Sequence, residues 1–219
     1  VHKDFNKMCA ELREVQMLRS DFINSYSHEF KTPITSINGF ARLLLEQETT
    51  EEERRQYLQI IADESARLAD LANSTILLSK LDCQEIVVNK TIYSLDEQLR
   101  ECAILLSREW SDKGISFTGD LAEVQYNGNA EMMKQLWLNL LSNAIKFTPP
   151  QGEIVLTLRK EGNNAVVQVA DTGPGMSEEV VAHIFERYYQ GDKSHKKQGL
   201  GLGLSISKRI ADLCGGRIT

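Results

Sequence analysis

Hydrophobic residues recur at steps of three and four along the first part of the chain, which is the spacing of one helix face. Pro33 lies inside this pattern, so we expect it to bend the helix or to loosen one hydrogen bond, because proline has no backbone N–H. The pattern fades at residues 46–49. Its members are Phe22, Tyr26, Phe30, Pro33, Ile37, Phe40 and Leu44.

A second amphipathic helix is predicted after a short turn. Thr50 and Glu53 have the spacing of a capping box, and the acidic residues at 51–53 suit the positive end of a helix. The helix should run to about Leu81, and the short turn makes the pair an antiparallel hairpin. Because one hairpin cannot cover both apolar stripes, we expect two copies to form a dimeric four-helix bundle, a homodimer. The second stripe is Leu58, Ile61, Leu68, Leu71, Thr75 and Leu78.

Beyond the hairpin, helix and strand patterns alternate, which predicts an α+β domain. Residues 83–91 read as a linker that leads into a strand, and residues 161–164 have the composition of a hairpin turn. The expected helices cover about 94–112, 129–147, 177–185 and 203–214. The expected strands lie at about 115–119, 122–126, 153–160 and 164–170.

Composition is that of a soluble globular protein. The chain has 219 residues, 42% hydrophobic and 26% charged, and its net charge of −6 argues against a nucleic-acid partner. No apolar run approaches the roughly 20 residues of a membrane helix, and no segment has the pattern of a signal peptide. The start at Val1 rather than Met suggests a fragment. The four cysteines (Cys9, Cys83, Cys102 and Cys214) form no CxxC pair, so we expect free thiols in a reducing compartment.

One histidine is expected on the outer side of the first helix. His28 is two residues from both Tyr26 and Phe30, so it points away from the apolar stripe. Glu29 is adjacent, and Thr32 lies one turn further on the same face. A neutral imidazole beside a carboxylate that accepts its proton suits phosphoryl transfer to nitrogen. An ordinary surface histidine explains this segment equally well.

Polar residues also share one side of a later helix. Asn139, Asn143 and Lys146 are four and three residues apart, which places two amide oxygens and an ammonium on one surface. Such groups can organise Mg²⁺ and phosphate. A solvated polar face is the alternative.

Two glycine segments suggest close backbone approach to a ligand. Asp171 ends a strand, where its carboxylate can accept a hydrogen bond from an adenine amino group, and Gly173 and Gly175 let the backbone come near the base. A plain strand-end turn is the alternative. Later, glycines at 199, 201 and 203 alternate with leucines just before a helix, whose free N–H groups attract phosphate. This spacing matches neither a Walker nor a Rossmann motif.

Five segments, in this order, resemble a sensor histidine kinase of a two-component system. The resemblance covers about residues 15–219 and implies a HisKA-type phosphoacceptor hairpin followed by a GHKL-type (Bergerat) ATP-binding α/β sandwich. The segments are the H-box at 27–33 (Ser-His-Glu-Phe-Lys-Thr-Pro), the N-box at 138–148, Asp-x-Gly-x-Gly at 171–175, the F-box at 184–190 and the G2 box at 199–203.

The resemblance implies an organisation as well. Residues 214–219 resemble the start of a strand pair that relatives complete, so we expect a fold truncated at its last strands. The chain would be the cytoplasmic portion of a membrane-anchored sensor, with membrane contact only through absent upstream segments. The implied domains are a coiled-coil lead-in at 1–20, the dimerisation and phosphotransfer domain at 21–82, a linker at 83–91 and the catalytic domain at 92–219.

Residue roles carry over by motif position. His28 becomes the autophosphorylated residue, Glu29 its general base, and Thr32 the residue that positions water for phosphatase activity toward a response regulator, whose aspartate receives the phosphoryl group. ATP and Mg²⁺ are the implied cofactors, with Asn139 and Asn143 as metal ligands. The implied nucleotide contacts are Asn139, Asn143, Lys146, Phe147, Asp171, Gly173, Gly175, Arg187, Lys193, Gly199, Leu200, Gly201, Leu202, Gly203 and Leu204.

One position departs from the family. Many relatives have arginine at the position of Gln190, where it contacts the γ-phosphate, so Arg187 or a lysine of the predicted lid (186–198) is the candidate substitute. Two other functions stay open. An ATP-driven conformational machine like gyrase or Hsp90 would have glutamate at the position of Asn139. A signalling module that binds ATP without transferring phosphate is the other.

Overall fold

The structure is a computed structural model that describes residues 27, 29–84, 86–189 and 201–219. They form two compact units, which divide between Thr75 and Ile76, inside helix α2 (Glu51–Asp82). The second unit therefore includes the last two turns of α2. Within the described chain, no helix combines the length and the apolar character that a membrane span requires.

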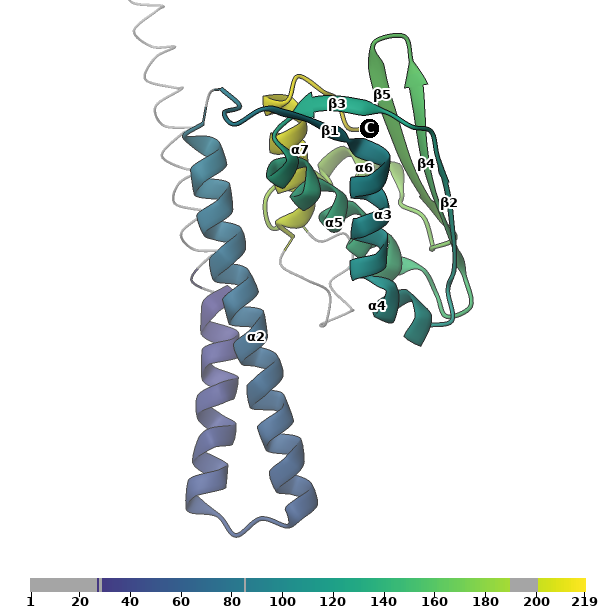
Figure 1. The fold of residues 1–219 in the computed structure, drawn as a ribbon. Helices are drawn as coiled ribbons and strands as arrows, with labels where there is room; N and C mark the ends of the chain where they lie inside the picture. The colour runs from purple at the N-terminus through teal and green to yellow at the C-terminus, as the bar shows by residue number, and fades with distance from the viewer. Residues whose placement is uncertain (1–26, 28, 85, 190–200) are drawn as a thin grey trace, which may run out of the picture. The chain divides into compact units, whose positions relative to one another are not determined.

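The first unit is the predicted antiparallel hairpin of two helices (Figure 1). Its first helix covers residues 29–46 of the described chain and passes through Pro33 without interruption. The predicted capping box is confirmed, because the Glu53 N–H donates to Thr50 Oγ1 at 3.2 Å and the Thr50 N–H donates to Glu53 Oε2 at 2.9 Å. That backbone bond, reinforced by the Thr50 hydroxyl, holds the pKa of Glu53 below its usual range. Phe40 contacts Tyr57 with ring centroids 5.2 Å apart and joins the two helices.

A three-stranded sheet forms the centre of the second unit. β4 (Glu153–Glu161) pairs in parallel with β2 (Ser116–Leu121) and antiparallel with β5 (Asn164–Asp171). The β4–β5 hairpin turns at residues 161–164, as predicted. Alternate residues of a strand point to one face, and on β4 the buried set is Ile154, Leu156 and Leu158.

Helices cover that buried face. Figure 1 shows α3 (Leu95–Leu105), α5 (Ala130–Phe147) and α7 (Gly203–Leu213) together on one side of the sheet, which confirms the α/β sandwich. The short helices α4 (Ser107–Asp112) and α6 (Glu178–His183) lie at connections. A core cluster joins α5 to the strands and consists of Ile115, Ala144, Ile145 and Ile154, with Leu106, Trp110, Phe117 and Val169 packed against it.

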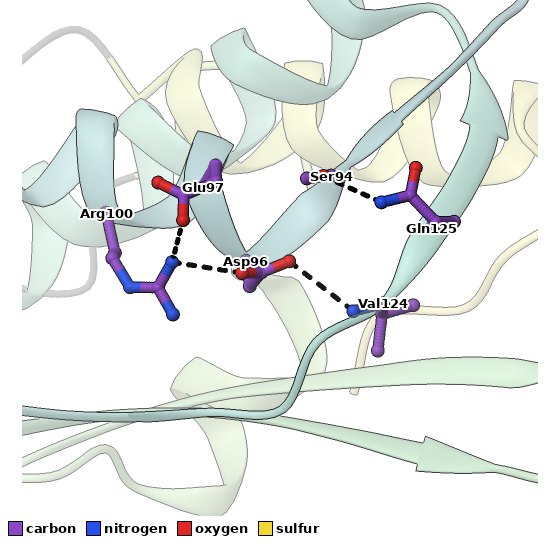
Figure 2. Close-up of polar contacts among 6 residues, drawn as sticks. All are labelled: Ser94, Asp96, Glu97, Arg100, Val124 and Gln125. Atoms are coloured by element: carbon purple, nitrogen blue, oxygen red, sulfur yellow. Dashed lines mark hydrogen bonds and ion pairs between the residues drawn. The ribbon is translucent and has the colours of Figure 1, made fainter.

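A separate two-stranded ladder holds the start of α3. β1 (Thr91–Ser94) pairs antiparallel with β3 (Gln125–Gly128). The buried carboxylate of Asp96 accepts a hydrogen bond from the Val124 N–H at 3.4 Å and pairs with Arg100 at 3.0 Å, while Gln125 donates to Ser94 (Figure 2). These contacts hold Val124 outside the ladder, so the strand predicted at 122–126 is in fact β3, which begins three residues later and ends two residues later.

Two further predictions of local structure were wrong. The single helix expected over 94–112 is broken at Leu106, whose backbone (φ −95°, ψ 7°) separates α3 from α4 and lets Trp110 stack on Phe117. The strand expected within 214–219 is not formed. Gly215 adopts φ +70° and closes the end of α7, and no described strand lies beside residues 217–219 to accept their backbone hydrogen bonds.

The predicted free thiols are confirmed at the three cysteines that the structure describes. Cys83 is exposed, Cys214 is half-buried and Cys102 is buried. Burial raises the pKa of the Cys102 thiol to about 11, which keeps it in the unreactive protonated form at neutral pH. Cys9 lies outside the described residues.

Replacing Asn129 with alanine should destabilise the second unit, because this residue caps α5. Its Oδ1 accepts the Met132 N–H at 3.0 Å, and its Nδ2 donates to the Val88 carbonyl at 2.9 Å. We expect Asn129→Ala to lower the free energy of unfolding by about 1–2 kcal/mol. Urea denaturation followed by tryptophan fluorescence isolates this unit, because Trp110 and Trp137 are the only tryptophans of the chain.

Asn129→Asp is the matched control for that substitution. It keeps an acceptor for the Met132 N–H and loses only the bond to Val88, so we expect a smaller loss than with alanine. Equal losses in the two variants would show that the cap contributes nothing measurable.

Candidate functional site

Helix α5 presents its polar residues on the side opposite the core. Its apolar face is buried through Trp137, Leu141 and Ile145, among others. Asn139 and Asn143 are both half-buried on the other face. Asn139 and Asn143 therefore lie on the same face of α5, as predicted.

The first asparagine of this face joins α5 to the start of α7. Asn139 Nδ2 donates to the Gly203 carbonyl at 3.2 Å, and its Oδ1 accepts from Gln135 Nε2 at 3.3 Å. These two partners fix which way the amide points. Asn139 thus helps to hold Gly203, at the start of α7, in place. It also offers a polar group to a ligand.

Among the described residues, Asn143, the second asparagine, has fewer hydrogen-bond partners than Asn139. A Cβ built on Gly203 would lie 3.9 Å from Asn143 Nδ2, which is ordinary van der Waals contact. Within the described residues, no hydrogen bond occupies the Asn143 amide. The described chain also has no group of three or more His, Cys, Asp or Glu side chains that could hold a metal ion. A magnesium ion at this site would therefore depend on amide oxygen, phosphate oxygens and water, a donor set that Mg²⁺ accepts.

The end of α5 carries a lysine and an aromatic ring. Lys146 Nζ lies 4.9 Å from the centroid of the Phe147 ring, and burial lowers the pKa of this lysine. Phe147 keeps 42% of its surface exposed, which leaves its ring accessible to a ligand. Lys113 closes the helix by donating to the carbonyls of Ile145, Lys146 and Thr148 at 2.7, 2.9 and 3.3 Å. Its charge also suits the negative end of the helix dipole.

The strand-end motif lies directly against this helix end. Asp171 Oδ1 accepts the Gly173 N–H at 2.8 Å, and the carboxylate is otherwise exposed. A Cβ on Gly173 would lie 3.1 Å from the Phe147 carbonyl oxygen and 2.5 Å from Asp171 Oδ1. Glycine is required here, because only its lack of a side chain allows β5 and α5 to come this close. Asp171, Gly173 and Phe147 are therefore brought together.

A second glycine allows a close backbone approach before α7. The Tyr188 N–H donates to the Gly201 carbonyl at 2.9 Å, and a Cβ on Gly201 would lie 2.7 Å from the Tyr188 carbonyl carbon. Gly201 has φ +65° and Tyr188 has φ +64°. Leu202 is buried below them, and the first N–H groups of α7 lack intrahelical partners.

Arg187 precedes that junction and contacts a carboxylate of α2. Its Nη2 donates to both oxygens of Asp82, at 2.8 and 2.9 Å. A role for Arg187 in nucleotide binding stays a prediction.

Two family models match the chain. Residues 18–84 match the His Kinase A (phospho-acceptor) domain, and residues 128–219 match the histidine kinase-, DNA gyrase B- and HSP90-like ATPase. The chain belongs to the sensor histidine kinases.

Individual histidine kinases agree with this assignment. Sensor protein SrrB of Staphylococcus aureus is 31% identical over 208 residues, which cover 93% of this chain and 36% of that protein. The chain thus spans about a third of the length of the curated relatives it matches.

Solved structures of the family are similar as well. Histidine kinase ThkA in complex with response regulator TrrA is 25% identical, with a TM-score of 0.75, and the match covers 93% of this chain and 57% of ThkA. Full-length ShkA in complex with AMPPNP is 30% identical, with a TM-score of 0.65, and the match covers 86% and 40%.

The hairpin that matches the phospho-acceptor model is described on either side of His28, which itself lies outside the described residues. Glu29 Oε2 pairs with Arg67 Nη2 of α2 at 3.3 Å, so the neighbouring helix holds the carboxylate. Thr32 is exposed on the first helix, as predicted. Among the predicted nucleotide contacts, Lys193, Gly199 and Leu200 also lie outside the described residues, as does Gln190.

Some residues that build the site were not predicted from the sequence. Gln135 precedes Asn139 by four residues, a helical spacing that could have indicated their contact. Lys113, Arg209 and Asp82 act through contacts with residues 32 or more positions away. No local pattern signals such pairs.

Gly173→Ala tests the close approach of β5 to α5. The new Cβ would displace the Asp171 carboxylate, the Phe147 carbonyl or both, so we expect binding of AMPPNP to weaken about tenfold, the loss of one well-placed hydrogen bond. Isothermal titration calorimetry measures this affinity. Gly119→Ala is the control, because a Cβ there meets nothing within 4 Å. Unchanged affinity in Gly173→Ala would mean that this turn is no part of the nucleotide site.

Proposed function

We propose that this chain is the kinase core of a sensor histidine kinase, which uses ATP to phosphorylate His28 and passes the phosphoryl group to an aspartate of a response regulator. The observation that carries the proposal is the meeting of Asn139, Asn143 and Gly203 beside a second cluster, Asp171, Gly173 and Phe147, in one unit. The first cluster suits phosphates, and the second suits a base.

The residues divide the task by their chemistry. The carboxylate oxygen of Asp171 that does not bind Gly173 can accept from the adenine amino group, and the exposed Phe147 ring offers an apolar face. The N-terminal end of α7, with Gly203, offers backbone N–H groups to phosphate. Asn143 would hold Mg²⁺, with Asn139 beside it. When bound, the ion neutralises phosphate charge.

The chemical step needs a nucleophile and a base. An imidazole nitrogen of His28 would attack the γ-phosphorus, the bond to the bridging oxygen would break, and ADP would leave. Glu29 would take the ring proton, and its contact with Arg67 supports a fixed position for the carboxylate. An asparagine at position 139 cannot act as a general base, which disfavours hydrolysis of ATP by water as in gyrase-like machines.

We further propose two partners. The response regulator TrrA in the ThkA complex is the precedent for a receiver domain as phosphoryl acceptor, and Thr32 would position water in a phosphatase reaction on that regulator. The second partner is another copy of the chain. In one copy, Leu58 stays 50% exposed and Ile34 51% exposed, so the hairpin has apolar surface for pairing into a bundle.

Labelling with γ-³²P ATP and Mg²⁺ tests the kinase reaction. The unaltered chain should acquire acid-labile, alkali-stable label, as expected of phosphohistidine, and His28→Ala should acquire none. Label that persists in His28→Ala would move the acceptor elsewhere. Absence of label in both, with AMPPNP still bound, would favour the module that binds ATP without transferring phosphate.

The two asparagines should respond differently to replacement. Asn143→Ala should abolish Mg²⁺-dependent binding of AMPPNP while leaving the urea midpoint of the second unit unchanged, because its amide has no described hydrogen bond to lose. Asn139→Ala should also lower that midpoint, because its bond to Gly203 joins α5 to α7. A stability loss of about 1 kcal/mol is typical of one such bond. Equal stability of the two variants would contradict this division of roles.

A further inference from the structure

The last turn of α2 is fixed within the second unit. Leu78 and Leu81 are buried, with 3% and 2% of their surface exposed. From α7, Arg209 Nε donates to the Leu81 carbonyl at 3.1 Å, and its Nη2 donates to the Gln84 carbonyl at 3.0 Å. The end of α2 therefore remains in place through contacts that do not involve Asp82, the last residue of the helix.

Asp82 uses this fixed position to present a carboxylate to Arg187. Both hydrogen bonds come from one guanidinium nitrogen, Nη2, rather than from the two-nitrogen fork that makes arginine–carboxylate pairs strong. The side chains are 42% and 37% exposed, so water also competes for the pair. The ion pair between Arg187 and Asp82 therefore has good hydrogen-bond distances, and another anion can replace Asp82 at low cost.

Arg187 belongs to the backbone that borders the phosphate side of the site. The next residue, Tyr188, donates to the Gly201 carbonyl, and two residues later Gly203 faces Asn139 and Asn143. The backbone of Arg187 is thus fixed beside the glycines that precede α7. Its long, cationic side chain is the part that is directed to Asp82.

We propose that Asp82 competes with nucleotide phosphate for Arg187 and so sets the affinity of this site for ATP. In this structure the guanidinium binds the carboxylate of α2. A triphosphate offers the same guanidinium a second anionic partner, and binding exchanges one for the other. This inference rests on the proposed function, because it requires a triphosphate in the second unit.

Removing the competitor should strengthen binding. We expect Asp82→Asn to tighten AMPPNP binding about two- to fivefold, the range expected from the loss of an exposed ion pair. In initial rates of His28 labelling, the ATP concentration that gives half the maximal rate (KM) should fall by the same factor while the maximal rate (kcat) stays unchanged, because Asp82 acts through Arg187 and touches no reacting atom. A merely structural role would move the urea midpoint and leave this KM-against-kcat split absent.

The Arg187→Gln background makes the experiment specific. If Asp82 acts through Arg187, Asp82→Asn should have no effect on AMPPNP affinity once Arg187 is glutamine. An equal gain in both backgrounds would show a general effect of negative charge and overturn the proposal. Weaker binding in Asp82→Asn, or no change, would overturn it as well.

A matched control removes another exposed carboxylate–guanidinium pair of the same unit. Asp120→Asn breaks the contact of β2 with Arg159 of β4 and should leave AMPPNP affinity unchanged. Calorimetric titration of the whole 219-residue chain supplies all these affinities. If the unaltered chain binds no AMPPNP, the proposed function fails, and this inference fails with it. If it binds and only the Asp82 effect is missing, this inference alone is wrong.

Discussion

Helix α5 must bury one face against the sheet while it offers the other to a ligand, and the arrangement of the second unit depends on this double demand. Trp137, Leu141 and Ile145 give the buried face, and burial of apolar surface is the main stabilising contribution in such a core. The helix cannot shift along its axis without moving these side chains out of the core. Asn139, Asn143 and Lys146 are therefore held at fixed positions by packing that occurs on the opposite side of the helix.

The two ends of α5 are fastened by polar groups from other segments. Asn129 caps the start of the helix and also donates to the Val88 carbonyl. At the other end, the Lys113 ammonium donates hydrogen bonds to three backbone carbonyls. Both contacts satisfy backbone groups that a helix terminus leaves unpaired. Phe147 is the last residue of that helix, and its carbonyl oxygen would lie only 3.1 Å from a Cβ on Gly173, so the held helix end leaves room there for glycine alone.

Helical periodicity and motif spacing predicted most of the elements, because both are local properties of the sequence. The capping box at Thr50 and the shared face of Asn139 and Asn143 depend on residues three or four positions apart, and both predictions held. What failed depended on distant partners. The β3 strand was misplaced because Val124 is held by Asp96, and the expected final strand is missing because no described neighbour pairs with it. The contact of Arg187 with Asp82 joins residues 105 positions apart, which no spacing rule reveals.

The division of the chain into units places the end of α2 with the second unit. The predicted linker at 83–91 is tied to the second unit, since Val87 is buried and the carbonyls of Gln84 and Val88 accept bonds from Arg209 and Asn129. The two compact units divide inside α2, after Thr75. The last turn of α2, with the Asp82 carboxylate on it, therefore belongs to the same unit as Arg187 and Arg209, and the contacts of that unit alone fix where the carboxylate lies.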